Sequence, residues 1–190
     1  SLPDRPRPSP PPFRLVTVAH LNARKNLSAL LEAFRAAFNG APDVLLTIVG
    51  DGPRRAALTR QAGRLGLGAK VSFLGAQPRR GVREALWNAH AFVLASRHET
   101  FGVVLVEAMA TGLPVVATRC GGPEDIVTEA TGCLVPPNAP AALAEALRTM
   151  RDRWSEYDPD RIRAYVLDEY GPEPFVQHTR SFYRRARADA

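Results

Sequence analysis

From residue 13 onward, short apolar segments alternate with longer segments whose apolar residues recur at helical spacing. The strand candidates cover 13–19, 43–50, 70–75, 91–96, 113–118 and 132–136. The helix candidates cover 26–38, 53–66, 79–89, 101–112, 123–127 and 139–154. This alternation implies βαβ units and a parallel sheet that is covered on both faces. We therefore expect an α/β fold, a doubly wound, Rossmann-like parallel sheet of about six strands with helices on both faces.

The two ends of the chain differ in composition from this alternating region. Residues 1–12 are rich in proline, which is typical of a stiff linker, and the start resembles mid-protein sequence. We interpret 1–12 as an interdomain linker and 13–155 as one domain, and we expect a further domain upstream. Residues 156–190 are more polar and are predicted to form two helical segments, separated at Gly171-Pro172.

Charge and cysteine content restrict the class of protein only weakly. The net charge of +6 suits phosphates, nucleic acid or an anionic membrane, but a preference for arginine codons explains it equally well. Two cysteines are no disulfide framework, so we expect reduced thiols and a cytoplasmic protein. No apolar run reaches the ~18 to 20 residues that a membrane span needs.

Parallel sheets of this kind bind ligands beyond the carboxyl ends of their strands, so the turns after the strands are candidate sites. The turn at 50–53 contains Gly50 and Gly52, but the third glycine of a dinucleotide-binding fingerprint is replaced by Arg55. The two glycines indicate either a tight turn or a backbone that a ligand can approach closely. After the first strand, Arg24 and Lys25 precede a helix start, which favours an anion site over solvated loop charges.

The segment 96–117 carries the most information. We expect Thr100 to cap the helix that follows, with the amides of Phe101, Gly102 and Val103 forming a cradle for phosphate. Glu107 lies in the same helix among apolar residues on every side, which predicts a buried helix. A buried carboxylate is costly without a partner. An internal arginine, a shifted pKa or the two hydroxyls of a ribose would each relieve that cost.

The pattern of Glu99 and Glu107, with seven residues between them, resembles the signature of the group 1 (family 4) retaining glycosyltransferases. It stands inside "SRHETFGVVLVEAMATGLPVVA" at 96–117. Further matches follow in the family's order and spacing: "RKN" at 24–26, "IVGDGP" at 48–53, "VSFLG" at 71–75, "GGPEDIV" at 121–127 and "TGCLVPP" at 131–137. The resemblance spans residues 13 to about 150. It implies the nucleotide-sugar-binding C-terminal domain of a two-domain GT-B enzyme, with 156–190 packing toward an N-terminal acceptor domain.

The resemblance also implies roles for individual residues. Glu107 would bind the ribose hydroxyls of the donor, and Glu99 would lie beside the donor sugar and its leaving phosphate. Lys25 matches the family's phosphate-binding lysine. Many members have Gly-Arg where this chain has Ala19-His20, so His20 replaces the usual arginine and Arg24 is a candidate substitute. The nucleobase is expected beside Leu74 and Gly75, and Gly121 and Gly122 are weaker candidates for a donor loop.

By this resemblance the function is transfer of a sugar from a nucleotide-diphosphate sugar, UDP- or GDP-linked, to an unknown acceptor. We expect the transferred sugar to retain its anomeric configuration. We also expect the reaction to need no metal ion, no cofactor and no protein nucleophile. We expect a cytoplasmic location, with peripheral contact at the inner face of the membrane as a further option, and no nucleic-acid partner. Separated from its acceptor domain, the fragment is expected to bind nucleotide and to transfer nothing.

Three other functions fit part of the sequence. A non-catalytic nucleotide-sugar-binding module needs the same donor residues. A nucleotide-sugar epimerase has a similar two-domain architecture, but such enzymes lack this pair of glutamates. A glycoside hydrolase also uses two carboxylates, but these lie about 5 to 9.5 Å apart across one bond. Here one glutamate is predicted in a loop and the other in a helix.

Overall fold

A computed structural model describes residues 8–171 and confirms the predicted α/β class. The strands are β1 (Phe13–Val18), β2 (Val44–Val49), β3 (Val71–Gly75), β4 (Ala91–Leu94), β5 (Val115–Thr118) and β6 (Gly132–Val135). The helices are α1 (Leu27–Ala37), α2 (Arg55–Arg64), α3 (Arg79–Trp87), α4 (Val103–Ala110), α5 (Pro123–Ile126), α6 (Pro140–Arg153) and α7 (Pro159–Tyr170). A short 3₁₀ helix, η1 (Trp154–Glu156), joins α6 to α7.

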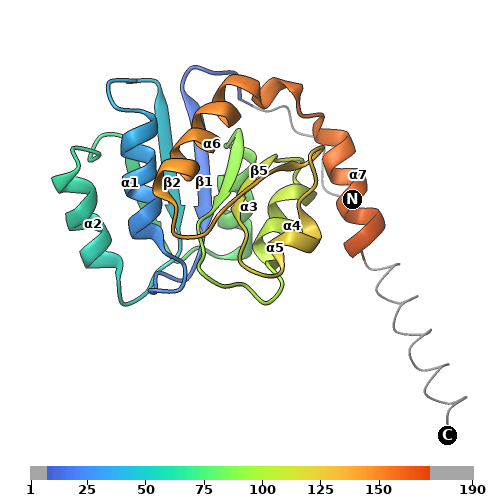
Figure 1. Cartoon of the computed structure of the whole chain (residues 1–190), viewed down its shortest axis with the longest axis horizontal. Helices are drawn as coiled ribbons and strands as arrows, with labels where there is room; N and C mark the ends of the chain where they lie inside the picture. Colours follow the sequence, from blue (N-terminus) through green and yellow to red (C-terminus); the bar gives the residue numbers. More distant parts are fainter. Residues whose placement is uncertain (1–7, 172–190) are drawn as a thin grey trace, which may run out of the picture.

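The six strands form one sheet in the order β3-β2-β1-β4-β5-β6, and every neighbouring pair is parallel. Figure 1 shows this sheet between its helices. The chain runs outward from β1 to β3, then returns to the centre and continues through β4 to β6. The order therefore reverses between β1 and β4, and open sheets of this kind bind ligands at such a reversal.

Helices cover both faces of the sheet, as the buried side chains show. Helices α1, α2 and α6 pack on one face together with Leu15 of β1. Helices α3, α4 and α7 pack on the other face together with Val16, the next residue of the same strand. All four residues of β4 and all four of β5 are buried, because both of their faces lie against helices. This two-sided burial explains why the central strands read as continuous apolar runs.

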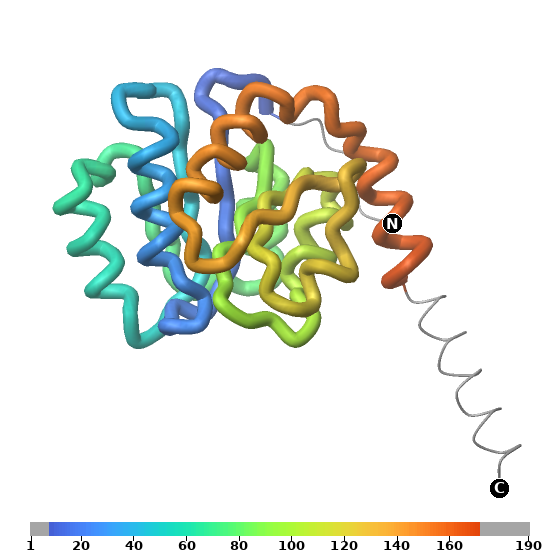
Figure 2. The backbone as a smooth tube through the Cα atoms, in the orientation of Figure 1, coloured from blue at the N-terminus to red at the C-terminus, as the bar shows by residue number. Residues whose placement is uncertain are grey.

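The polar region after residue 155 divides into two parts. Its first part forms α7, which packs against α4 and α5, as Figure 2 shows at the right of the backbone trace. The hydroxyls of Tyr165 and Tyr170 donate to the carbonyl oxygens of Ile126 (3.1 Å) and Asp125 (2.9 Å). The second predicted helical segment lies outside the described residues. The interdomain role of 1–12 and of 156–190 stays a prediction.

Across residues 8–171, no helix combines the length and the apolar character that crossing a membrane would require.

Candidate functional site

The candidate site lies at the carboxyl edge of the sheet, where the loop after β1 faces the loop after β4. A cavity of about 650 Å³ opens there. Its walls come from the loops after β1, β2 and β3 and from the starts of α3 and α4. The lining residues are Val18, Ala19, His20, Arg24, Lys25, Val49, Gly50, Asp51, Gly52, Ala76, Gln77, Val82 and Val104. The cavity therefore occupies the position that the strand order predicts.

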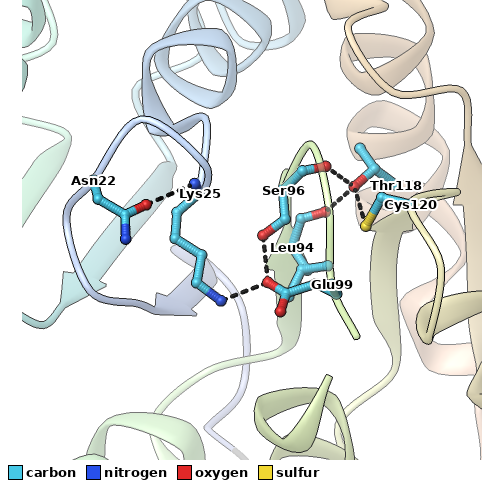
Figure 3. Close-up of polar contacts among 7 residues, drawn as sticks. All are labelled: Asn22, Lys25, Leu94, Ser96, Glu99, Thr118 and Cys120. Carbon is cyan, nitrogen blue, oxygen red and sulfur yellow. Dashed lines mark hydrogen bonds and ion pairs between the residues drawn. The ribbon is translucent and has the colours of Figure 1, made fainter. Parts of the chain in front are cut away.

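Lys25 and Glu99 form an ion pair across this edge, between the loops after β1 and β4 (Figure 3). The distance from Lys25 Nζ to Glu99 Oε1 is 2.5 Å, and the two side chains are 13% and 10% exposed. The Ser96 hydroxyl donates to the same carboxylate oxygen at 2.6 Å. Sequence reasoning placed both charged residues in the crevice but did not predict their pairing. Ser96 was missed as a site residue, although it opens the same motif.

Backbone hydrogen bonds hold the Glu99 loop in place. The Glu99 amide donates to the carbonyl of Cys120 (2.8 Å), and the Gly122 amide donates to the carbonyl of Glu99 (2.9 Å). One strand away, the Thr118 hydroxyl donates to the Ser96 carbonyl at 2.6 Å. Burial raises the pKa of the Cys120 thiol. The end of β5 and the loop after it thus fix the backbone from which the Glu99 carboxylate extends.

Gly50 and Gly52 make room for the chain's own backbone. A Cβ on Gly50 would lie 1.9 Å from the Ala19 carbonyl oxygen, and one on Gly52 would lie 2.8 Å from backbone atoms of Leu21. Both glycines have positive φ, 126° and 157°. The close neighbour is thus the loop after β1, which carries Lys25 into the site. Both glycines also line the cavity, so contact with a ligand stays a prediction.

The prediction that Glu107 lies in a buried helix is wrong. Helix α4 is shorter than predicted, and Glu107 is exposed near its carboxyl end. The apolar neighbours Val104 and Val106 are only partly buried, and Val103 is 58% exposed. Only Leu105, Ala108 and Met109 form the buried face of the helix. One side of α4 therefore borders solvent although its residues are apolar.

Glu107 lines a second cavity, of about 480 Å³, beside the first. The two cavities share Val18, Gln77 and Val82, so they adjoin and form one groove, which begins at the carboxyl edge and continues between α3 and α4. Within residues 8–171, no hydrogen bond or ion pair engages the Glu107 carboxylate. The alternative that an internal arginine pairs with Glu107 is therefore wrong for residues 8–171. The Glu107 carboxylate oxygens are available to a ligand with hydroxyl groups. Arg79 and Arg83 line the same cavity and were missed by sequence reasoning.

The cap predicted at Thr100 is also wrong. Gly102 directly precedes α4 as its N-cap residue, in a left-handed conformation (φ 100°), and no side chain caps the helix. Thr100 is exposed and lies two residues before this N-cap residue. The first amides of a helix have no partner inside it, so those of Phe101, Gly102 and Val103 remain candidates for phosphate.

The other predicted site residues lie around the groove. His20 and Arg24 are exposed and line the cavity that Lys25 also lines. Leu74 and Gly75 lie one strand further out and are not among the lining residues. Opposite His20, the Gly52 amide and the Arg55 guanidinium hold the pKa of Asp51 below its ordinary value. The outer wall of the groove therefore combines one acidic group with several basic ones.

Two further features of residues 8–171 do not extend the site. No group of three or more histidine, cysteine, aspartate or glutamate residues has the arrangement of a metal site. A third cavity, of about 490 Å³, lies between the start of β6 and the η1–α7 junction. Arg153 and Glu156 in its wall pair with each other, and none of the predicted site residues lines it.

Comparison with known proteins adds independent information. A family model described as glycosyl transferases group 1 matches residues 4–164. A GDP-mannose-dependent alpha-(1-6)-phosphatidylinositol dimannoside mannosyltransferase of Mycobacterium tuberculosis is 32% identical over 82% of this chain and 38% of its own length. A D-inositol 3-phosphate glycosyltransferase of Corynebacterium glutamicum is 33% identical over 90% of this chain and 40% of its own length. The chain thus spans about 40% of the length of these curated relatives.

Solved structures agree on the fold. The Anabaena protein HepE in complex with UDP superposes with a TM-score of 0.81 at 25% identity, over 92% of this chain and 49% of that one. The lipopolysaccharide outer core galactosyltransferase WaaB, in its apo form, superposes with a TM-score of 0.81 at 24% identity, over 92% and 50%.

Proposed function

Because the chain belongs to the group 1 glycosyl transferases, we propose that it is the donor-binding half of a GT-B enzyme that uses a nucleotide-diphosphate sugar. The observation that carries this proposal is the groove at the carboxyl edge. Lys25 lines one of its two cavities, and Glu107, whose carboxylate has no hydrogen bond or ion pair within residues 8–171, lines the other. A nucleoside diphosphate carries negative charge at one end and vicinal hydroxyls nearer the other, so the two halves of the groove complement it.

In this arrangement, Lys25 and the amides at the start of α4 hold the diphosphate. Cations and helix-start amides stabilise a leaving diphosphate as its charge develops, which lowers the barrier to transfer. Glu107 accepts hydrogen bonds from the ribose hydroxyls, because its oxygens have no competing partner among the described residues. Glu99 lies beside Lys25, where it would reach the donor sugar next to the leaving phosphate.

The choice of nucleobase is left to experiment. UDP is bound in the structure of HepE, whereas the mycobacterial relative is named for GDP-mannose. We propose a UDP- or GDP-linked donor, with retention of configuration and without a required metal ion. An N-terminal domain would bind the acceptor. A cytoplasmic location with peripheral membrane contact is part of the same proposal.

Calorimetric titration of the 190-residue chain with UDP, GDP and ADP tests this function. We expect one of UDP and GDP to bind more tightly than ADP, and Glu107→Ala to weaken that binding by about tenfold, the equivalent of ~1.4 kcal/mol. Equal binding to the wild-type chain and the variant would show that Glu107 does not contact the nucleotide.

A non-catalytic binding module is the second candidate for the chain as it stands. Both cavities that form the groove are open to solvent among residues 8–171. We expect the 190-residue chain to bind nucleotide without transferring sugar. Joining it to the acceptor domain should restore transfer, and release of free sugar or product by the chain alone would contradict this expectation.

A further inference from the structure

One oxygen of Glu99 has two donors in the resting site. Glu99 Oε1 accepts from Lys25 at 2.5 Å and from Ser96 at 2.6 Å, and Figure 3 shows both contacts converging on that atom. The positive charge of Lys25 is therefore already neutralised before any ligand arrives. Within residues 8–171, no second carboxylate pairs with Lys25.

This pairing conflicts with a simple role for Lys25 as a phosphate ligand. A diphosphate that approaches Lys25 also approaches the Glu99 carboxylate, and like charges repel strongly when both are poorly solvated. Lys25 is only 13% exposed, so water screens the pair weakly. The incoming anion must therefore displace Glu99 from Lys25 or share the ammonium group with it.

Glu99 has a reason to remain in place during that exchange. Ser96 is 1% exposed and its hydroxyl stays available to Glu99 Oε1, while the backbone of Glu99 is bonded to Cys120 and Gly122. The carboxylate thus loses one donor and keeps the other. It stays next to the position from which the diphosphate must later depart.

We propose that Glu99 and the diphosphate compete for Lys25, so that the ion pair weakens binding of the nucleoside diphosphate and favours its release after transfer. The inference rests on the proposed function, because it takes Lys25 to be the phosphate ligand. No covalent bond changes in this step. One ionic contact of the Lys25 ammonium group replaces another, and the reverse exchange returns the site to its resting state.

The opposite effect of Glu99 is also physically reasonable, which makes the sign of the change decisive. A carboxylate that held Lys25 in the correct rotamer would pre-organise the site and strengthen phosphate binding. Competition predicts that removing the charge of Glu99 tightens binding. Pre-organisation predicts that the same change weakens it.

The experiment compares the same substitution at the two glutamates of the motif. The 190-residue chain, Glu99→Gln and Glu107→Gln are titrated with UDP and GDP by calorimetry at low ionic strength. Glu99→Gln keeps an oxygen for Ser96 and removes the negative charge, so the dissociation constant should fall by about tenfold. Glu107→Gln replaces one acceptor oxygen with an NH2 group and the other with a neutral, weaker acceptor, so the proposed ribose contact weakens and the dissociation constant should rise. Far-ultraviolet circular dichroism confirms that both variants are folded.

A Lys25→Gln background separates competition from direct repulsion. In that background Glu99 has no ammonium group to withhold, and Glu99→Gln should change the dissociation constant less than twofold. The double variant also contains no unpaired charge at this position, so it guards against a folding defect. An undiminished tenfold effect in this background would show direct repulsion and would overturn competition for Lys25.

The two proposals fail in different ways. If Glu107→Gln weakens nucleotide binding but Glu99→Gln weakens it too or leaves it unchanged, competition is wrong and the proposed function stands. If neither nucleotide binds to the wild-type chain or to Glu99→Gln, both proposals are contradicted.

Discussion

Replacing Gly50 by alanine should disrupt the loop that carries Lys25. The new Cβ would lie 1.9 Å from the Ala19 carbonyl oxygen, a contact that real Cβ atoms essentially never make below 3.0 Å, so this carbonyl must retreat by more than 1 Å. The φ of 126° adds backbone strain of about 1–3 kcal/mol. The bonds from Gly50 N to Gly75 O and from Ala19 N to Val49 O are also disturbed, at about 1 kcal/mol each. We therefore expect Gly50→Ala to lower the free energy of unfolding by about 3–5 kcal/mol.

Urea denaturation followed by circular dichroism measures this loss, and Gly63→Ala is the matched control. Gly63 lies inside α2, where a Cβ meets nothing within 4 Å and φ is in the ordinary range. Alanine there should raise the free energy of unfolding by about 0.5–1 kcal/mol, because glycine is a poor helix former. A Gly50→Ala variant as stable as the wild-type chain would refute the close contact between the two loops.

Two further predictions concern stability. Ser96→Ala removes a buried hydrogen bond to Glu99 and should lower the free energy of unfolding by about 1–2 kcal/mol, whereas loss of the exposed hydroxyl in Thr59→Ala should cost less than about 0.5 kcal/mol. If urea denaturation shows the same loss of unfolding free energy for Ser96→Ala and Thr59→Ala, the buried hydrogen bond of Ser96 does not contribute as proposed. Burial, with a contribution from Tyr165, raises the pKa of Tyr170 to about 12. An unfolded tyrosine loses its proton near pH 10, so stability should fall as pH rises from about 10 to 12. Tyr170→Phe should reduce that fall in melts across this range, and an unchanged fall would place its origin elsewhere.

Much of the fold was predictable because the apolar patterns of the individual segments agree with the strands and helices that the parallel sheet requires. The strands of the sheet centre are apolar throughout and the helices have clear periodicity, as in α1 with its buried Leu27, Leu30, Leu31 and Phe34. The strand order was not predicted, because it follows only from the fold class. In the structure, β1 and β4 are neighbours, so the loops after them lie side by side. Lys25 and Glu99, 74 residues apart, were both predicted in the crevice because each follows a predicted strand, and ligands bind beyond the carboxyl ends of parallel strands.

The environment of Glu107 could not be predicted, because periodicity describes which residues are apolar and not what covers them. A segment that is apolar on all sides predicted a buried helix, yet α4 leaves Val103 and Glu107 exposed, and Glu107 lines the groove. The start of α4 was placed too early because threonine is a good capping residue. A glycine with positive φ ends the loop instead, two residues later. The ion pair and its Ser96 contact depend on rotamers that residue identity does not specify.

The contact between Glu107 and a ribose is the central claim, and a paired change in protein and ligand tests it most directly. Calorimetry would compare whichever of UDP and GDP binds with its 2′-deoxy counterpart, using the wild-type chain and Glu107→Ala. We predict that losing the hydroxyl weakens binding to the wild-type chain by about tenfold, or ~1.4 kcal/mol, and leaves binding to the variant nearly unchanged. An equal loss of affinity in both proteins would contradict the claim.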